Sequence, residues 1–220
     1  NIFPVIKKFL YSDHEIFLRE LISNAVDATQ KLKTLSSIGE MKGELGDLTI
    51  HVAVDKEAKT LTVTDRGVGM TAEEVDKYIN QIAFSGAEEF MEKYKNQSII
   101  GHFGLGFYSA FMVADEVHID TLSYQDGATP VHWECDGGTE FDMKDGSKTT
   151  VGTEITLFLN EDCLEFANEY RAREVIEKYC SFMPTPIFLS KANAETEYET
   201  IDAADKLDTD TVVEEIHEEA

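Results

Sequence analysis

The chain has 220 residues, of which 42% are apolar, so it is long enough for one sizeable hydrophobic core. It carries 43 Asp and Glu against 19 Lys and Arg, and the formal net charge of −24 argues against binding a nucleic-acid backbone or an anionic membrane through bulk charge. We therefore expect no nucleic-acid partner and no membrane partner. An anionic ligand would therefore need a local group of hydrogen-bond donors to bind to this acidic chain.

The number and spacing of the cysteines, together with the lack of a signal-type segment, indicate the cellular compartment of the protein. Cys135, Cys163 and Cys180 are odd in number and form no CxxC pattern, so they predict neither a disulfide framework nor a zinc site. The chain begins with Asn1 and has no apolar stretch of signal type, and its longest uncharged run, GLGFYSAFMVA, is too short to cross a bilayer. We expect an excised piece of a larger soluble, cytoplasmic protein.

The first predicted element is an amphipathic helix. Ser12 and Glu15 have capping-box spacing, and the helical pattern runs to about Ile38, before Gly39. Within FLRELISNAVDAT and the next turn, a polar stripe comprises Glu20, Asn24, Asp27 and Lys31. This stripe is compatible with a solvated helix face or with one wall of a site, although an amide is an unusual choice for a purely solvated face.

A β-hairpin is predicted next, from the alternating segments LTIHVAVD (48–55) and TLTVTD (60–65). Asp65 ends the second strand, and Gly67 and Gly69 follow it at a spacing that lets the backbone turn sharply and approach a flat ligand. An ordinary glycine turn with Asp65 as its hydrogen-bonding residue explains the same pattern equally well.

Short helices are predicted over residues 71–100, opened by two capping boxes, Thr71 with Glu74 and Ser85 with Glu88. The glycine-rich GHFGLGF then precedes an apolar helix, where backbone amides at a positive helix end could hold phosphates. It is neither a Walker loop nor a dinucleotide fingerprint, because Phe107 and Tyr108 replace Lys and Ser or Thr and because no strand precedes it. The alternative that GHFGLGF is only a glycine-rich helix start, with no role in binding phosphate, stays open.

The second half of the chain is predicted to be mostly strands, at 116–125, 130–136, 139–144 and 153–159. Asn160 is a candidate cap for a helix predicted over 162–182, and PTPIFLS (184–190) is the last predicted strand. Early helices, late strands and hairpin-like spacing favour an α+β two-layer sandwich over a doubly wound parallel fold. In this fold a mixed, mostly antiparallel sheet has helices covering one face.

Four motifs in order carry a family resemblance: helical ExxxNxxDA, DxGxGM, GxFGxGF and a late GT. They resemble the nucleotide-binding fold of gyrase, sensor histidine kinases, MutL proteins and the ninety-kilodalton heat-shock chaperones. FLRELISNAVDA, IAFSGAEEF, GHFGLGFYSAFMVAD and GTEITLFL are most similar to the chaperones, of the bacterial HtpG type. The resemblance implies an ATP-binding domain over 1–190 with an ATP pocket between helices and sheet, a lid over 71–100, and an acidic extension over 191–220 toward a middle domain.

The resemblance also implies roles for individual residues. Glu20 would be the general base that activates water, held in its resting orientation by Arg19, and Asn24 would bind Mg²⁺. Asp65 would accept a hydrogen bond from the adenine amino group, helped by Thr153 through water, while Met70 and Phe107 would pack on the base and sugar. Further ATP-binding residues are implied at the phosphate end and along the glycine-rich turn: Asp27, Ala28, Lys31, Gly69, Gly101, Phe103, Gly104, Leu105 and Gly106.

The implied activity is slow ATP hydrolysis in a molecular chaperone that binds client proteins, with ATP or ADP and Mg²⁺ as ligands. The family completes its site with a middle-domain arginine and dimerises chiefly through a C-terminal domain, so we expect a homodimeric parent and a fragment that can be monomeric. Phe84, His102 and Arg66 depart from common family residues and leave the lid details open. The alternative is a nucleotide-sensing module without meaningful hydrolysis; a protein kinase is disfavoured because Asp27 stands where kinases have a second Asn.

Overall fold

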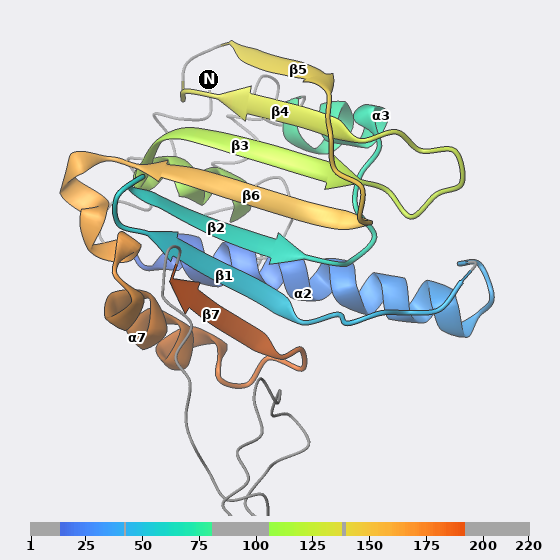
Figure 1. Cartoon of the computed structure of the whole chain (residues 1–220), viewed down its shortest axis with the longest axis horizontal. Helices are drawn as coiled ribbons and strands as arrows, with labels where there is room; N and C mark the ends of the chain where they lie inside the picture. The colour runs from blue at the N-terminus through green and yellow to red at the C-terminus, as the bar shows by residue number, and fades with distance from the viewer. Residues whose placement is uncertain (1–13, 42, 81–105, 138–139, 192–220) are drawn as a thin grey trace, which may run out of the picture.

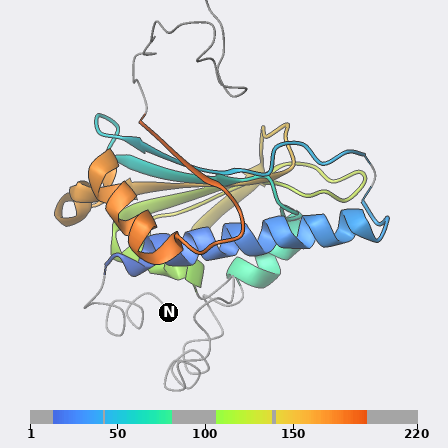
Figure 2. The same cartoon turned by 90° about the horizontal axis from the view of Figure 1, so that it is seen from below.

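The computed structural model describes residues 14–41, 43–80, 106–137 and 140–191. In these ranges the chain forms two layers, an open seven-stranded sheet and a layer of helices on one of its faces (Figures 1 and 2). The α+β sandwich predicted from the sequence is therefore confirmed. The predicted extension over 191–220 lies outside the described residues except for Lys191, so the boundary at residue 190 stays a prediction.

The sheet has the strand order β5-β4-β3-β6-β2-β1-β7. All neighbouring strands are antiparallel except β1 and β7, which pair in parallel, so the sheet is mixed and mostly antiparallel as predicted. The strands are β1 (Ile50–Asp55), β2 (Thr60–Asp65), β3 (Ala114–Leu122), β4 (Val131–Cys135), β5 (Phe141–Asp145), β6 (Gly152–Leu159) and β7 (Ile187–Lys191). Each strand predicted from alternation is present, with ends shifted by a few residues.

Alternation along the central strands decides which face of the sheet meets the helices. In β1 and β2 every second residue is buried, and the same pattern continues through β6 and most of β3. Because successive side chains of a strand point to opposite faces, the buried set forms the floor of the core. The other set, which includes threonines, histidines and acids, faces away from the helices.

The helix α2 (Ile16–Ser37) is the longest element under the sheet (Figure 2). It agrees with the helix predicted to end at about Ile38, and Gly39 at φ +77° follows its end. Its apolar side is fully enclosed against the sheet and the neighbouring helices, at Phe17, Leu18, Leu21, Ile22, Ala25, Val26 and Leu32. The predicted cap Ser12 lies outside the described residues.

The segments flanking the undescribed range 81–105 are shorter and less regular than predicted. Thr71 and Glu74 form the predicted capping box at α3 (Ala72–Val75), but the chain then continues as the π-helix η1 (Asp76–Asn80). The apolar helix predicted after the glycine-rich turn is largely the 3₁₀-helix η2 (Tyr108–Met112). The Ser85 and Glu88 capping box lies outside the described residues.

The helix predicted over 162–182 is divided in two, and the candidate cap Asn160 occupies the N-cap position of the first part without a side-chain capping bond. The 3₁₀-helix η3 (Glu161–Ala167) contains Cys163 with non-helical dihedrals, and Asn168 is extended before α7 (Glu169–Cys180) begins. Asn160 makes no side-chain capping bond, whereas Asn168 accepts hydrogen bonds from the amides of Tyr170 and Arg171. Asn side chains compete with helical backbone bonds, so the second Asn starts a new helix instead of continuing the first.

Among the described residues, no helix combines the length and apolar character needed to cross a lipid bilayer.

The position of the helix cap gives a stability prediction. Asn168→Ala should lower the free energy of unfolding by about 1 kcal/mol, because it leaves two amides of α7 without their acceptor. Asn160→Ala is the matched control, since the Asn160 side chain caps no helix amide and donates a 3.4 Å bond to the Met112 carbonyl oxygen. Urea denaturation of both variants measures the difference, and a larger loss for Asn160→Ala would contradict the assignment.

Candidate functional site

A group of buried polar side chains lies where β2, β6 and β3 face the helices. Asp65 ends β2 and pairs with Thr153 at the start of β6, and Thr153 pairs with Thr121 of β3. All three face the core side of the sheet and are nearly inaccessible, at 6%, 4% and 0% exposure. Buried polar groups must find partners, so their hydrogen bonds define the local structure.

The two threonines form a short chain of hydrogen bonds. Their Oγ1 atoms are 2.8 Å apart, and Thr121 Oγ1 also accepts a 2.9 Å bond from the Met70 amide. Thr121 Oγ1 is in addition 3.2 Å from the Gly152 carbonyl oxygen. These bonds hold the loop after β2 against the ends of β3 and β6.

Asp65 is a buried carboxyl with a strongly altered acidity. Burial raises its pKa to about 7, although the backbone N–H groups of Gly67 and Thr153 and the charge of Lys148 act in the opposite direction. The Gly67 N–H donates to Asp65 Oδ1 at 2.8 Å. The carboxyl is therefore oriented by the loop that follows it, and its proton is exchangeable near neutral pH.

That loop approaches its neighbours so closely that only glycine fits at two positions. A Cβ on Gly67 would lie 2.4 Å from the Ala28 carbonyl carbon of α2, and the Val68 amide donates to the Ala28 carbonyl oxygen at 3.2 Å. Gly69 has φ +65°, and a Cβ there would lie 1.9 Å from the Leu122 carbonyl oxygen. The loop thus joins α2 to β3, and the DxGxG glycines are needed for backbone approach.

Glu20 is a second buried carboxylate, on α2. It is 3% exposed, and Arg19 Nη2 lies 3.1 Å from its Oε1 atom. The other oxygen, Oε2, is buried without a hydrogen-bond partner among the described residues, and a Cβ on Gly106 would lie 2.7 Å from it. Burial raises the pKa of Glu20, and Arg19 lowers it.

The remaining residues of the α2 stripe divide by exposure. Asn24 is 3% exposed and lies one turn from Glu20, whereas Asp27 and Lys31 are exposed and Ala28 is intermediate. A purely solvated helix face would not enclose Glu20 and Asn24. The first two positions of the stripe therefore do not belong to a solvated helix face, and their place in a binding site stays a prediction.

Two residues expected to contact the base lie inside the core. Phe107 is completely buried, and its ring packs edge-on against Tyr108, Phe111 and Trp133. Met70 is 7% exposed and is part of the same core. Gly101, Phe103, Gly104 and Leu105 lie outside the described residues, so their predicted roles stay predictions.

Sequence reasoning did not single out Thr121, which ties Met70 to Thr153. A signal was present, because Thr121 falls in phase with the buried Val117 and Ile119 of β3, and a hydroxyl at a core position needs a partner. Gly152 is the glycine of the late GT motif. It has φ +133°, and a Cβ would lie 2.2 Å from the Asp65 carbonyl oxygen.

The oxygen atoms of the buried polar side chains on α2 are suitable ligands for a hard metal ion bound with a nucleotide. Oxygen atoms of carboxylates and amides are the ligands that Mg²⁺ accepts, and Glu20 and Asn24 present both types from one side of α2. Glu20 Oε2, which has no hydrogen-bond partner in the described part of the chain, can accept a hydrogen bond from water. A nucleotide and Mg²⁺ are therefore compatible with the residues present.

Comparison with known proteins identifies the family. Residues 11–151 match the family model "Histidine kinase-, DNA gyrase B-, and HSP90-like ATPase", which is more than half of the chain. The chain belongs to this ATPase family. Chaperones named HtpG align with most of the chain.

Three relatives illustrate the similarity. "Chaperone protein htpG" of Bacteroides fragilis is 59% identical over 215 residues, 96% of this chain and 31% of the relative. The HtpG of Bacteroides thetaiotaomicron is 64% identical over 193 residues, 87% of this chain and 28% of the relative. The HtpG of Cronobacter sakazakii is 44% identical over 206 residues, 90% of this chain and 33% of the relative. The chain thus spans about a third of the length of these chaperones.

The close approach of Gly67 to α2 is testable. Gly67→Ala should lower the free energy of unfolding by about 1–3 kcal/mol, because the new methyl group would overlap the Ala28 backbone. Gly46→Ala is the control, since a Cβ there meets nothing within 4 Å and its φ is not positive. Chemical denaturation compares the two, and equal stability of both variants would show that the loop is not held against α2.

Proposed function

We propose that the chain is the ATP-binding and slowly hydrolysing domain of a molecular chaperone. The observation that carries the proposal is Glu20, a buried carboxylate on α2 whose Oε2 atom has no hydrogen-bond partner among the described residues. Leaving such an oxygen unpaired costs stability, so its retention is explained best by a ligand that supplies the partner. Membership of the ATPase family indicates that this ligand is a water molecule beside a nucleotide.

The adenine end of the nucleotide is proposed to bind at Asp65. The Asp65 carboxylate accepts from the Gly67 amide at Oδ1, and because each of its two oxygens can accept more than one hydrogen bond, it keeps the capacity to accept one from the adenine amino group. Thr153, whose hydroxyl bonds to Thr121, would hold a bridging water. Gly69 allows the backbone to lie near the base, and burial makes each of these polar contacts selective.

The phosphate end is proposed to lie along α2. When bound, Mg²⁺ would neutralise phosphate charge, with Asn24 as its protein ligand. Glu20 would orient the attacking water and take a proton at Oε2, and the raised pKa of Glu20 brings its basicity closer to that needed at neutral pH. Asp27, Ala28 and Lys31 would border the phosphates, with Gly101–Gly106 supplying amides to them.

The chaperone function is proposed from the HtpG relatives. Residues 71–100 would form a lid whose closure excludes water from the nucleotide, and an arginine from a middle domain would complete the site. The longer protein would be a cytoplasmic homodimer that assists the folding of client proteins. The isolated domain would bind nucleotide well and hydrolyse it slowly.

One observation favours a second candidate, a nucleotide-sensing module without meaningful hydrolysis. Arg19 lies 3.1 Å from Glu20 Oε1 and pairs with the proposed base. If that ion pair persists with nucleotide bound, Glu20 would stay in a resting orientation. Partner capture that follows ATP occupancy and survives replacement of Glu20 would favour this candidate.

The adenine assignment predicts the effect of Asp65→Asn. This change replaces an acceptor by a group that is partly a donor, so ADP binding should weaken by about 2–4 kcal/mol. Asp55→Asn is the matched control, because Asp55 also ends a strand and accepts turn amides, those of Glu57 and Ala58. Calorimetry measures both, and an ADP affinity of Asp65→Asn within a factor of two of wild type would refute the assignment.

The role of Glu20 predicts a separation of binding from turnover. In a protein that includes the middle domain, Glu20→Gln should reduce ATP hydrolysis by about 100-fold or more while ADP binding persists. Glu177→Gln, on the exposed side of α7, should change neither quantity. Unchanged hydrolysis in Glu20→Gln with binding intact would remove Glu20 from the mechanism.

A further inference from the structure

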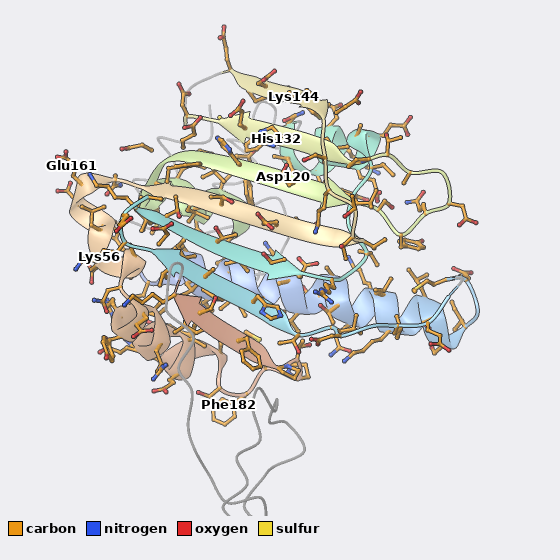
Figure 3. All side chains as sticks on the ribbon, in the orientation of Figure 1. Lys56, Asp120, His132, Lys144, Glu161 and Phe182 are labelled. Atoms are coloured by element: carbon orange, nitrogen blue, oxygen red, sulfur yellow. The ribbon has the colours of Figure 1, made fainter. Side chains whose placement is uncertain are left out.

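The face of the sheet that points away from the helices carries a cluster of histidines and acids on β3 and β4, of which Asp120 and His132 are labelled in Figure 3. His118 and Asp120 alternate with the buried Val117 and Ile119, and on β4 His132 and Glu134 alternate with buried residues in the same way. The strand register pairs His118 with Glu134 and Asp120 with His132. The four side chains therefore gather on one face by cross-strand pairing.

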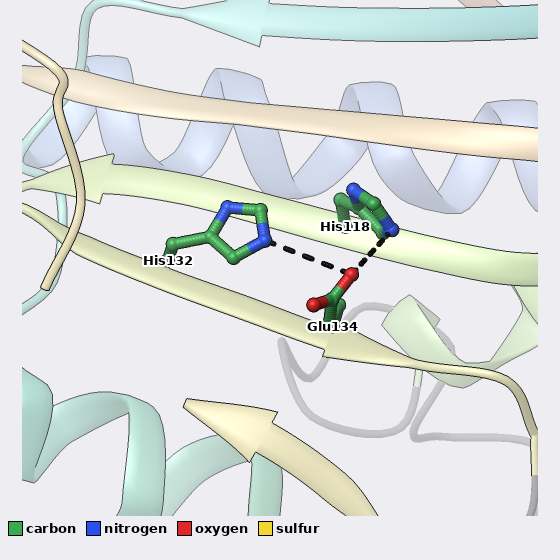
Figure 4. Close-up of side chains that lie close together, drawn as sticks. All are labelled: His118, His132 and Glu134. Carbon is green, nitrogen blue, oxygen red and sulfur yellow. Dashed lines mark ion pairs between the residues drawn. The ribbon is translucent and has the colours of Figure 1, made fainter. Parts of the chain in front are cut away.

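Three of these side chains converge on one point (Figure 4). Glu134 Oε2 lies 2.9 Å from His118 Nε2 and 3.9 Å from His132 Nε2. One ligand atom from each of the three residues lies within 4.8 Å of the others. Ligand atoms around a tetrahedral Zn²⁺ lie about 3.3 Å apart for bonds of about 2.0 Å, so side-chain movements of at most about 1.5 Å would bring these atoms to the spacing that encloses an ion.

The contact between His132 and Asp120 selects the tautomer whose Nε2 atom can bind a metal. Its Nδ1 atom lies 2.7 Å from Asp120 Oδ1, and a carboxylate can only accept, so Nδ1–H is the donor. In the neutral ring Nε2 then keeps its lone pair, and Nε2 is the atom that faces Glu134. A carboxylate on the distal nitrogen is the common partner of metal-bound histidine, where it orients the ring and raises its basicity.

His118 lies among carboxylates without forming a hydrogen bond to them. Its Nε2 atom is 2.9 Å from Glu134 Oε2 and 3.2 Å from Glu116 Oε1, yet this buried atom has no hydrogen-bond partner among the described residues. A ligand inserted between these atoms would give Nε2 a partner. Because both neighbours are carboxylates, the surroundings favour a cation as that ligand.

Packing holds the cluster in place while leaving it accessible. The His118 ring contacts Phe158 at 4.7 Å between ring centroids and lies edge-on to His132 at 5.2 Å. The side chains of His118, His132 and Glu134 are 22%, 17% and 28% exposed. Rigid strands and partial exposure are the conditions in which an ion can enter a preformed site.

We propose that His118, His132 and Glu134 bind a divalent transition-metal ion, with Zn²⁺ as the best match. Two imidazole nitrogens and one carboxylate favour Zn²⁺ over Mg²⁺ or Ca²⁺, which prefer oxygen ligands. Water or Glu116 would complete the coordination, and Asp120 positions His132. The ion would link β3 to β4 on the face opposite the buried Asp65 and Thr153, so this inference does not depend on the proposed nucleotide site.

Calorimetric titration of the purified chain with ZnCl₂ tests the proposal. Wild type should bind one ion saturably, Asp120→Ala should weaken binding about 10- to 100-fold, and His132→Gln should weaken it more. His51→Gln is the matched control, because His51 lies on the same sheet face but stacks on Phe188 away from the cluster. Circular dichroism shows whether each variant is folded.

Three outcomes would overturn the proposal: no saturable Zn²⁺ binding to wild type, equal affinity in folded His132→Gln, or an equal loss in His51→Gln. Glu134→Gln provides a second variant if His132→Gln does not fold. Zn²⁺ should also raise the thermal midpoint of wild type and His51→Gln while leaving that of the ligand variants unchanged, because a ligand that binds only the folded state stabilises it.

Discussion

The burial of the Asp65 carboxyl between the sheet and the helices is the constraint on which the site depends. Removing a carboxyl from water is costly, and here the cost appears as a pKa raised to about 7 despite the Gly67 amide bond. The backbone can surround this group only because glycine permits close approach on both sides, at Gly67 against α2 and at Gly152 against Asp65 itself. The end of β2, the loop that follows it and α2 are therefore packed against one another with no room for side chains between them.

The two faces of the same sheet are used for different chemistry. On the side that faces the helices, Asp65, Thr121 and Thr153 are buried and hydrogen-bonded, which suits selective recognition of a flat polar ligand. On the open side, His118 and His132 lie among carboxylates and remain accessible. Because side chains alternate along a strand, Asp120 and Thr121 are neighbours in sequence yet belong to opposite faces.

Much of the fold could be predicted from the sequence, because amphipathic periodicity and alternation report burial directly. The long α2 helix, the β1–β2 hairpin and the DxGxG loop followed from local pattern. The division of η3 from α7 did not, because Asn160 and Asn168 are both plausible caps and only packing decides between them. Thr121 and the His118 cluster were missed for a related reason, since cross-strand neighbours depend on register, which a single sequence does not reveal.

The central claim is that an adenine nucleotide hydrogen-bonds to Asp65, and the acidity of Asp65 gives a direct measurement. ADP titrations at pH 6.5 in buffers of different ionisation enthalpy report the number of protons released on binding. In free protein Asp65 is partly protonated at this pH, since its pKa is about 7, and an amino donor favours the ionised form. The account predicts proton release that disappears in Asp65→Asn, whereas buffer-independent heats for wild type would contradict it.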